Sequence, residues 1–207
     1  MLITALQKKN SKVIVFFDDN SFCTLDYRVA LNYGLRTNDF ISEEKKEQLI
    51  TESIFLSTRD SAFRSLSRRP HSVSELRTKL IRKGWKKEII QRVLEDLIDK
   101  NFLDDEKFAI AFIEERSKKK VGINKIKAEL MKRGIDKKIS DSLLVNLDPD
   151  SSFENAQTLA RKKNRLLQER GFDNRKIRTK LYSFLLSRGF ETEIIIKIIS
   201  EITPEND

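Results

Sequence analysis

Few residues in this chain are of a type that performs catalysis or holds a metal ion. His71 is the only histidine and Cys23 the only cysteine, so zinc sites and cysteine–histidine nucleophile pairs are excluded. Neither of the phosphate-cradling motifs GxxxxGK[ST] and GxGxxG occurs. Asp104, Asp105 and Glu106 are more typical of an acidic helix start than of a magnesium site, and His71, just ahead of a helix cap, is interpreted as a plain loop residue. We therefore expect no catalytic activity, metal or cofactor.

Lysine and arginine are the side chains that could carry a function. The net charge is +9, and the charged residues are distributed unevenly along the chain. Residues 1–50 hold seven basic and seven acidic side chains, whereas residues 151–190 hold ten basic and three acidic ones. Such an excess favours polyanions without specifying a sequence. A solvated basic surface that only keeps the protein soluble is the alternative. The charge and its clustering favour nucleic-acid contact.

The basic residues recur at matching places along the chain, which predicts a basic track for nucleic acid or a partner protein. One set lies on the expected middle helices of three repeats and the other at the upstream helices or their ends. The first set is Arg77, Lys79, Arg82, Lys83, Lys125, Lys127, Lys132, Arg133, Lys176, Arg178, Lys180 and Arg188. The second is Arg68, Arg69, Lys118, Lys119, Lys120, Arg161, Lys162 and Lys163. Trp85, Phe108, Phe112 and Phe190 have core-type spacing, so packing is favoured over base stacking.

Three glycines, Gly84, Gly134 and Gly189, lie 50 and 55 residues apart and mark a repeat. Apolar residues stand at fixed offsets from each glycine. They are Leu76, Leu80, Trp85, Ile89, Val93 and Leu97; then Ile126, Leu130, Ile135, Ile139, Leu143 and Leu147; then Leu181, Leu185, Phe190, Ile194, Ile198 and Ile202. Steps of four keep residues on one helical face. Each unit is therefore predicted to contain two amphipathic helices, joined where glycine adopts the left-handed conformation after a helix end.

A third helix is expected upstream in each unit, at 58–68, 105–119 and 153–168. Ser72 with Glu75 forms a capping box, and Asp104 is a predicted N-cap. Three-helix units of this period stack and bury a continuous core. The third unit contains five extra residues, and Arg178 stands where Val73 and Ile123 predict an apolar residue.

The N-terminal part differs from the repeats. Residues 13–17 and 21–25 flank a turn at 18–20, which predicts a β-hairpin, and 2–6 could pair as a third strand. A helix is expected from the cap at Ser42. We divide the chain into 1–50 (hairpin and the start of a linking helix), 51–103, 104–150 and 151–202 (three-helix repeats 1 to 3), and an acidic tail, 203–207.

The remaining composition is that of a mainly α, soluble protein. No run of about 18 apolar residues suggests a membrane span, and the N-terminus lacks signal-peptide features. The lone cysteine agrees with a reducing cytoplasm, where we expect a monomer.

Several stretches together resemble the RecX regulatory family, bacterial modulators of the RecA recombinase. Residues 69–76 look like the family's RPRSxxEL, with His71 in place of a basic residue; 103–109 is similar to its DDxxFA segment. Residues 122–135 resemble its second repeat, and 188–190 its terminal RGF. The order and spacing of these pieces carry the resemblance, which covers about 54–202 and, more loosely, the hairpin.

The resemblance implies tandem three-helix repeats in an elongated, curved body. It also implies binding to RecA filaments on single-stranded DNA, inhibition of ATP hydrolysis and strand exchange, and a place in homologous recombination, DNA repair and the SOS response. Double-stranded DNA is a further partner to consider. We accordingly predict a non-catalytic, mainly negative modulator of RecA.

Two other functions stay open. One is a stand-alone helix-turn-helix transcription regulator, whose recognition helix after Gly84 would present Lys86, Lys87, Gln91 and Arg92 to base edges. The acidic and apolar helix after Gly189 is unsuited to a DNA groove. The other is a purely structural scaffold, which would show no affinity for DNA at moderate salt.

Overall fold

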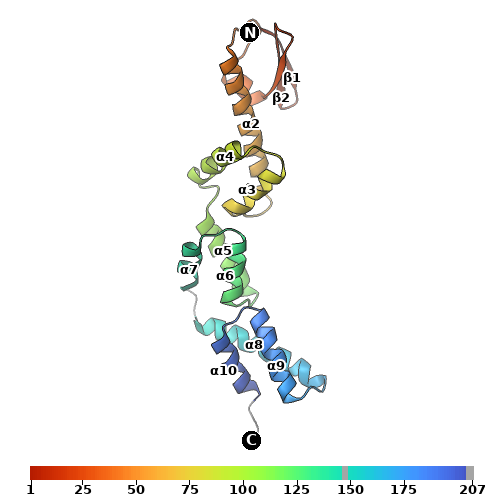
Figure 1. Cartoon of the computed structure of the whole chain (residues 1–207), viewed down its shortest axis with the longest axis vertical. Coiled ribbons are helices and arrows are strands. Elements are labelled where there is room, and N and C mark those ends of the chain that lie inside the picture. The colour runs from red at the N-terminus through yellow and green to blue at the C-terminus, as the bar shows by residue number, and fades with distance from the viewer. Residues whose placement is uncertain (146–148, 204–207) are drawn as a thin grey trace. The chain divides into compact units, whose positions relative to one another are not determined.

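The computed structural model describes residues 1–145 and 149–203, which fold mainly into α-helices (Figure 1). The chain divides into two compact units, Met1–Leu103 and Asp104–Asp207, described in turn. Within the described ranges, no helix combines the length and apolar character needed to cross a membrane.

Unit 1 begins with an antiparallel sheet of three strands in the order β1-β2-β3. They are β1 (Ile3–Lys9), β2 (Lys12–Phe17) and β3 (Phe22–Asp26). Val13, Val15 and Phe17 alternate with more exposed residues and point into the core, as expected of a sheet with one buried face. The predicted hairpin, its loop of more than two residues and the third strand are confirmed.

After the short helix α1 (Tyr27–Asn32), the chain forms the long helix α2 (Glu43–Leu66). The Ser42 hydroxyl accepts a hydrogen bond from the Lys45 N–H at 3.1 Å, which confirms the predicted N-cap. The helix expected at 58–68 is not a separate element. It is the second half of α2, because no glycine or proline interrupts residues 43–66.

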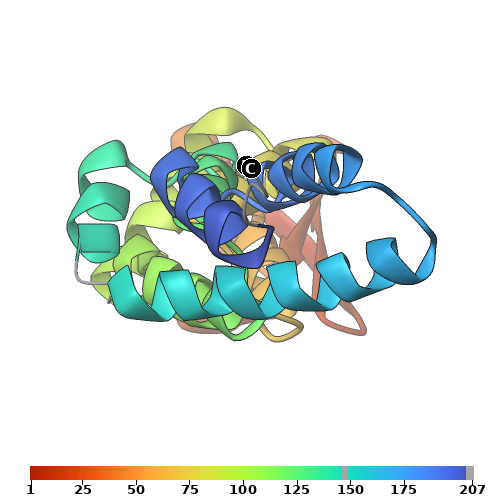
Figure 2. The ribbon, with the colours of Figure 1, turned by 90° about the horizontal axis from the view of Figure 1, so that it is seen from below.

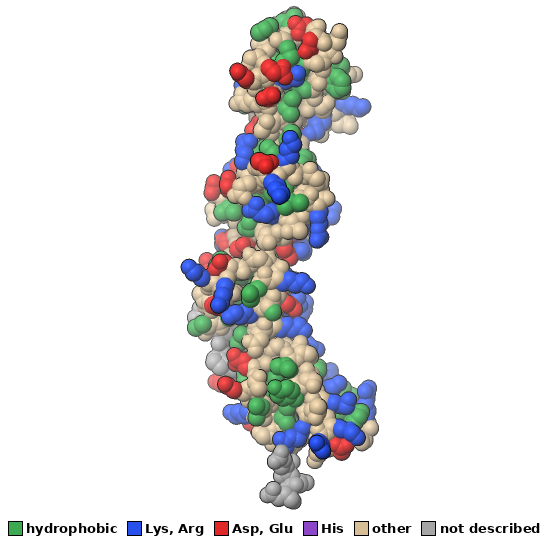
Figure 3. All heavy atoms as spheres, viewed as in Figure 1, with side chains coloured by type: hydrophobic (Ala, Val, Ile, Leu, Met, Phe, Trp, Pro, Cys, Tyr) green, Lys and Arg blue, Asp and Glu red, His purple; other side chains and the backbone are tan. Residues whose placement is uncertain are grey.

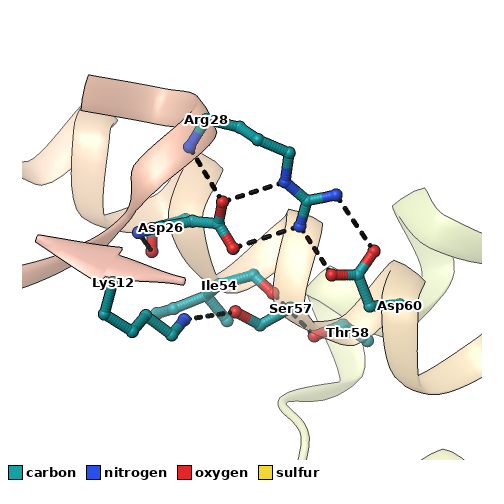
Figure 4. A network of polar contacts seen from close by, with 8 residues as sticks. Lys12, Asp26, Arg28, Ile54, Ser57, Thr58 and Asp60 are labelled. Atoms are coloured by element: carbon teal, nitrogen blue, oxygen red, sulfur yellow. Dashed lines mark hydrogen bonds and ion pairs between the residues drawn. The ribbon is translucent and has the colours of Figure 1, made fainter. Parts of the chain in front are cut away.

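An ion-pair network ties the sheet to α2 (Figure 4). The Arg28 guanidinium lies between two carboxylates, with Nε 2.9 Å from Asp26 Oδ1 and Nη2 2.6 Å from Asp60 Oδ2. Its hydrogen bond to the buried Asp26 lowers the pKa of that carboxyl, and both acceptors raise the pKa of Arg28. Lys12 Nζ donates to Ser57 Oγ at 2.7 Å. The sheet is thus fixed to α2 by paired charges and a hydrogen bond.

Three helical repeats follow, the first sharing α2 with the sheet. Repeat 1 ends unit 1, and repeats 2 and 3 form unit 2. Their remaining helices are α3 (Val73–Arg82) and α4 (Lys87–Asp99); α5 (Asp105–Lys118), α6 (Ile123–Lys132) and α7 (Lys137–Val145); and α8 (Pro149–Glu169), α9 (Asn174–Ser187) and α10 (Thr192–Ile202). In Figure 2, α9 and α10 lie on one side of α8, against which both pack.

The three glycine turns have the same geometry. Gly84, Gly134 and Gly189 have φ of 84°, 74° and 85°, which confirms the left-handed conformation. In repeat 1 the Gly84 N–H donates to Ile81 O at 2.9 Å and the Trp85 N–H to Leu80 O at 3.4 Å. This pair of bonds is a Schellman motif, and it satisfies carbonyls that a helix end leaves open. The large apolar residue after each glycine then packs into the core of its repeat.

The predicted caps of α3 and α5 also form. Ser72 Oγ accepts from the Glu75 N–H at 3.1 Å, and Asp104 accepts from the N–H groups of Glu106 and Lys107 at 3.0 Å. Hydrogen bonds from Lys107 lower the pKa of Asp104. Its carboxylate therefore has a structural role at this helix start.

The described residues form four hydrophobic clusters, one with the sheet and one in each repeat, and within unit 1 Phe55 packs against both clusters. The prediction of a single continuous core was therefore wrong. Repeats 2 and 3 meet through backbone instead. The Gly122 N–H donates to Arg188 O at 2.9 Å, and the Asn124 N–H donates to Gly189 O at 3.1 Å.

The extra residues of repeat 3 lengthen its helices, since α9 has 14 residues against ten in α3 and in α6. Arg178 lies within α9 and donates to Thr203 O at 3.2 Å, while its neighbour Ile177 is buried in the core. In α10 the buried residues are Ile195, Ile198 and Ile199, with the predicted Ile194 and Ile202 half-buried. Leu147 and the tail residues 204–207 lie outside the described residues.

Candidate nucleic-acid interface

The twenty basic residues singled out from the sequence all lie at the surface. Twelve are exposed, eight are half-buried, and none is in a core. Figure 3 shows Lys and Arg side chains over α3 in unit 1, and over α6 and around α9 in unit 2. What distinguishes these residues is whether each already has a partner within the protein.

Several of the twenty are engaged in ion pairs. The pairs are Arg69 with Glu75, Lys119 with Glu115, Lys127 with Asp141, and Lys176 with Asp173. Exposed pairs of this kind contribute about 0–1 kcal/mol. They reduce the local positive charge without removing the cations from the surface.

Other predicted residues brace their own repeat. Arg133 Nη1 donates to Glu129 O at 3.2 Å, and its guanidinium lies 4.4 Å from the centre of the Phe112 ring. Lys180 Nζ lies 4.8 Å from the centre of the Phe172 ring. These cation–π contacts are worth about 0.5–1 kcal/mol at exposed sites.

A third group has no polar or ring partner among residues 1–145 and 149–203. The members, which lack such a partner for their side chains, are Arg68, Arg77, Arg82, Lys118, Lys120, Lys132, Arg161 and Lys162. The aromatic residues considered for base stacking instead belong to cores: Phe112 and Phe190 are buried, and Phe108 and Trp85 pack against the clusters of their repeats.

Two basic clusters emerge from the packing of the helices. In unit 1, Lys83 Nζ donates to Ser61 Oγ at 2.8 Å, which joins α3 to α2. Arg64 comes three residues after Ser61 on the same face of α2. Arg68 comes seven residues after Ser61 and lies just beyond the end of that helix. On α3, Lys79 precedes Lys83 by one turn. We call Arg64, Arg68, Lys79 and Lys83 the α2–α3 cluster. Arg64 was missed in the sequence, although its spacing from Arg68 was the available signal.

His71 was wrongly interpreted as a plain loop residue. It is 4% exposed, with Nδ1 2.8 Å from Arg69 O and Nε2 3.3 Å from Lys79 Nζ. A carbonyl only accepts and an ammonium only donates, so the ring must be neutral with its proton on Nδ1. Burial lowers the pKa of His71, and the charges of Arg69 and Lys79 lower it further. The residue therefore holds Lys79 in place.

In unit 2, the end of α9 brings together Lys125, Lys163 and Arg188, which we call the α6–α9 cluster. Lys125 Nζ donates to Ser187 O at 3.1 Å. Lys163 and Arg188 each lie 5.6 Å from the centre of the Phe184 ring. Sequence reasoning proposed the three cations but did not place them together, and it missed Phe184.

No metal centre accompanies these clusters, since the described residues contain no group of three or more His, Cys, Asp or Glu side chains arranged to hold an ion. The clusters can attract and hold anionic groups through lysine and arginine. Arginine contributes a planar fork of donors and lysine a compact charge.

Three family models match this chain, one for each repeat. They describe the first, second and third three-helix domains of RecX and match residues 59–97, 104–144 and 150–199.

Curated relatives span nearly the whole chain. "Regulatory protein RecX" of Clostridium botulinum (strain Alaska E43 / Type E3) is 32% identical over 197 residues, which cover 95% of this chain and 92% of the relative. The protein of the same name from Clostridium perfringens (strain 13 / Type A) is 31% identical, and the match covers 96% of this chain and 93% of that relative.

Solved structures share the fold. A crystal structure of regulatory protein RecX superposes with a TM-score of 0.76 at 20% identity, over 95% of this chain and 98% of that one. The crystal structure of RecX from Lactobacillus salivarius superposes with a TM-score of 0.64 at 25% identity, over 72% of this chain and 96% of that one. Repeat by repeat and over nearly its full length, this chain belongs to the RecX family of regulatory proteins.

Proposed function

We propose that this chain is a non-catalytic regulator of the RecA recombinase. In this proposal it binds RecA filaments on single-stranded DNA and inhibits ATP hydrolysis and strand exchange. Membership of the RecX family supports the regulatory role. The observation that carries the DNA-binding part is the α2–α3 cluster, whose four cations have no carboxylate partner among the described residues.

The arrangement of the cations favours several moderate contacts over one dominant one. The α2–α3 cluster and the α6–α9 cluster belong to different units, and Lys132, Arg161 and Lys162 present further free charges. Each phosphate contact adds to affinity and to its salt dependence. No single lysine or arginine is therefore expected to be indispensable.

The helix-turn-helix alternative is weaker because two polar residues of its recognition helix are already engaged. Gln91 Nε2 donates to Glu95 Oε1 at 2.6 Å, and the Arg92 guanidinium lies 5.3 Å from the centre of the Phe55 ring. Reading a base edge would require both side chains to leave these contacts.

The experiment that tests the proposal is a titration of RecA ATP hydrolysis on single-stranded DNA with this protein, starting far below stoichiometric amounts. We expect inhibition at a small fraction of the RecA concentration, because simple competition for DNA requires far more protein. Inhibition only when the DNA is saturated would indicate a general DNA-binding module. A protein with no effect and no DNA affinity at moderate salt would be a scaffold.

A further inference from the structure

We propose that the α2–α3 cluster is a binding site for one backbone phosphate of single-stranded nucleic acid, with His71 as the positioning residue for Lys79. This inference rests on the proposed function and names the ligand group and the residues that hold it in unit 1. It adds Arg64 and His71 to the residues expected from the sequence.

Helix packing, not chance proximity on one helix, brings the four cations together. The bond from Lys83 to Ser61 sets the basic face of α3 against the face of α2 that carries Arg64, with Arg68 just beyond the helix end. The contact between His71 and Lys79 anchors the other end of the α3 face. Two helices and the start of the loop between them therefore contribute cations to one region of unit 1.

The positive charge of the α2–α3 cluster is not offset by any carboxylate contact among residues 1–145 and 149–203. None of the four cations contacts a carboxylate among the described residues, in contrast to nearby Arg69, which pairs with Glu75 at 2.8 Å. Loss of water lowers the pKa of Lys83, and the charges of Arg64, Lys79 and Arg68 lower it further. Uncompensated repulsion costs stability in the free protein, and a bound phosphate would relieve it.

The ligand chemistry follows from the donors. Two guanidinium forks and two ammonium groups suit the oxygens of a phosphate, which arginine binds bidentately and lysine binds as a compact charge. Arg68 and Lys83 are exposed at the C-terminal ends of α2 and α3. A phosphate on an extended strand can approach them there without entering a deep pocket, as in other single-strand binders.

The test is salt-dependent binding of a fluorescent oligothymidylate to the full-length chain, comparing Lys83→Met with the matched control Lys87→Met. Lys87 is also exposed in repeat 1 but stands outside the cluster. For Lys83→Met we expect about tenfold weaker binding at low salt, the loss typical of one charged hydrogen bond. The slope of log affinity against log salt should fall by about 0.7.

Two further variants separate a binding role from a structural one. Lys83→Arg keeps the charge and should restore the slope. Without DNA, the melting temperature of Lys83→Met should change little at low salt, because the relief of repulsion offsets the lost hydrogen bond to Ser61. A lower melting temperature with an unchanged slope would mean that Lys83 only supports the fold, and the phosphate site would be rejected.

An NMR titration of 13C-labelled lysine methylenes distinguishes the possible sources of phosphate and tests the site independently of RecA. Lys83 should respond to the oligonucleotide at far lower concentration than to inorganic phosphate. A response to inorganic phosphate alone would reassign the site to a free anion. If wild type binds DNA and inhibits RecA but Lys83→Met behaves like Lys87→Met, the site is wrong and the proposed function stands. If wild type does not bind DNA, both fail.

Discussion

Gly122→Ala should separate repeat 2 from repeat 3 and destabilise unit 2. Gly122 has φ of −73° and ψ of 156°, values open to any residue, so its backbone conformation does not require glycine. Glycine is required instead because the backbone of Gly189 and Phe190 approaches it closely. A Cβ placed there would lie 2.3 Å from both C and O of Gly189 and 2.4 Å from Phe190 N.

The cost can be worked from these distances. Non-bonded carbon atoms pack at about 3.5–4.0 Å, so the two backbones would have to part by more than about 1 Å. That separation breaks the bonds from the N–H groups of Gly122 and Asn124, each worth about 1 kcal/mol. Residual overpacking adds about 1 kcal/mol or more. A loss of about 3 kcal/mol lowers the melting temperature of a domain of this size by about 10 °C or more.

Differential scanning calorimetry of the full chain measures this, with Gly171→Ala as the control. Gly171 has φ of +72° and nothing within 4 Å of an added Cβ, so its substitution carries only the left-handed backbone cost of about 1 kcal/mol. Amide exchange at Asn124 should speed up in Gly122→Ala alone. The reasoning fails if Gly122→Ala melts within about 1 °C of wild type, or if Gly171→Ala is the more damaging change.

Three other predictions concern the turn, the buried imidazole and the basic surface. Gly84→Val should lower the melting temperature of unit 1, because a β-branched residue is strained at φ of +84°; an unchanged value would show that the turn tolerates a side chain. The pKa of His71 is lowered in the folded state. The contribution of the neutral imidazole to the free energy of unfolding is therefore present above the unfolded pKa of about 6.5 and is lost as the pH falls below that value. The melting temperature of His71→Gln should therefore change less between pH 7.5 and 5.5 than that of wild type. An equal change in the two proteins would contradict this explanation. Replacing Lys132 and Arg133 together by alanine should weaken DNA binding and flatten its salt dependence. Lys132→Ala alone separates the charge effect from the loss of Arg133 packing on its aromatic ring, and an unchanged slope in the double variant would remove both residues from the interface.

The features of the fold that could be predicted are those determined within one or two helical turns. A glycine followed by a large apolar residue specifies a Schellman turn locally, and Gly84 forms it as expected. The caps at Ser72 and Asp104 follow from the same short range. The strand alternation from Val13 to Phe17 likewise has one buried face.

The features that could not be predicted depend on approaches between distant segments. Nothing near His71 in the sequence indicates that the α2–α3 packing buries it. Gly122 occupies the position that corresponds to the capping Ser72 in repeat 1, counted back from the turn glycine. The loss of a capping side chain there was a usable signal. The carbonyls of Arg188 and Gly189, 66 residues or more away in sequence, replace the missing cap.

The same contact determines how unit 2 can bind an anion. The negative end of the α9 dipole meets the positive end of α6, and the N–H groups of Gly122 and Asn124 are already paired with α9 carbonyls. Phosphate contact at this junction of unit 2 must therefore rely on side chains.

The side chains of the α6–α9 cluster are held in place by that contact, because Lys125 lies in the first turn of α6 and Arg188 caps the end of α9. Opening the contact would separate Lys125 from Lys163 and Arg188, so Gly122→Ala should lower both stability and DNA affinity. In unit 1, Lys83→Met should lower affinity while leaving stability nearly unchanged, because the relief of repulsion within the α2–α3 cluster offsets the lost hydrogen bond to Ser61. A large loss of stability in Gly122→Ala and a small change in Lys83→Met would thus distinguish a cluster that depends on backbone packing from one whose cations repel one another.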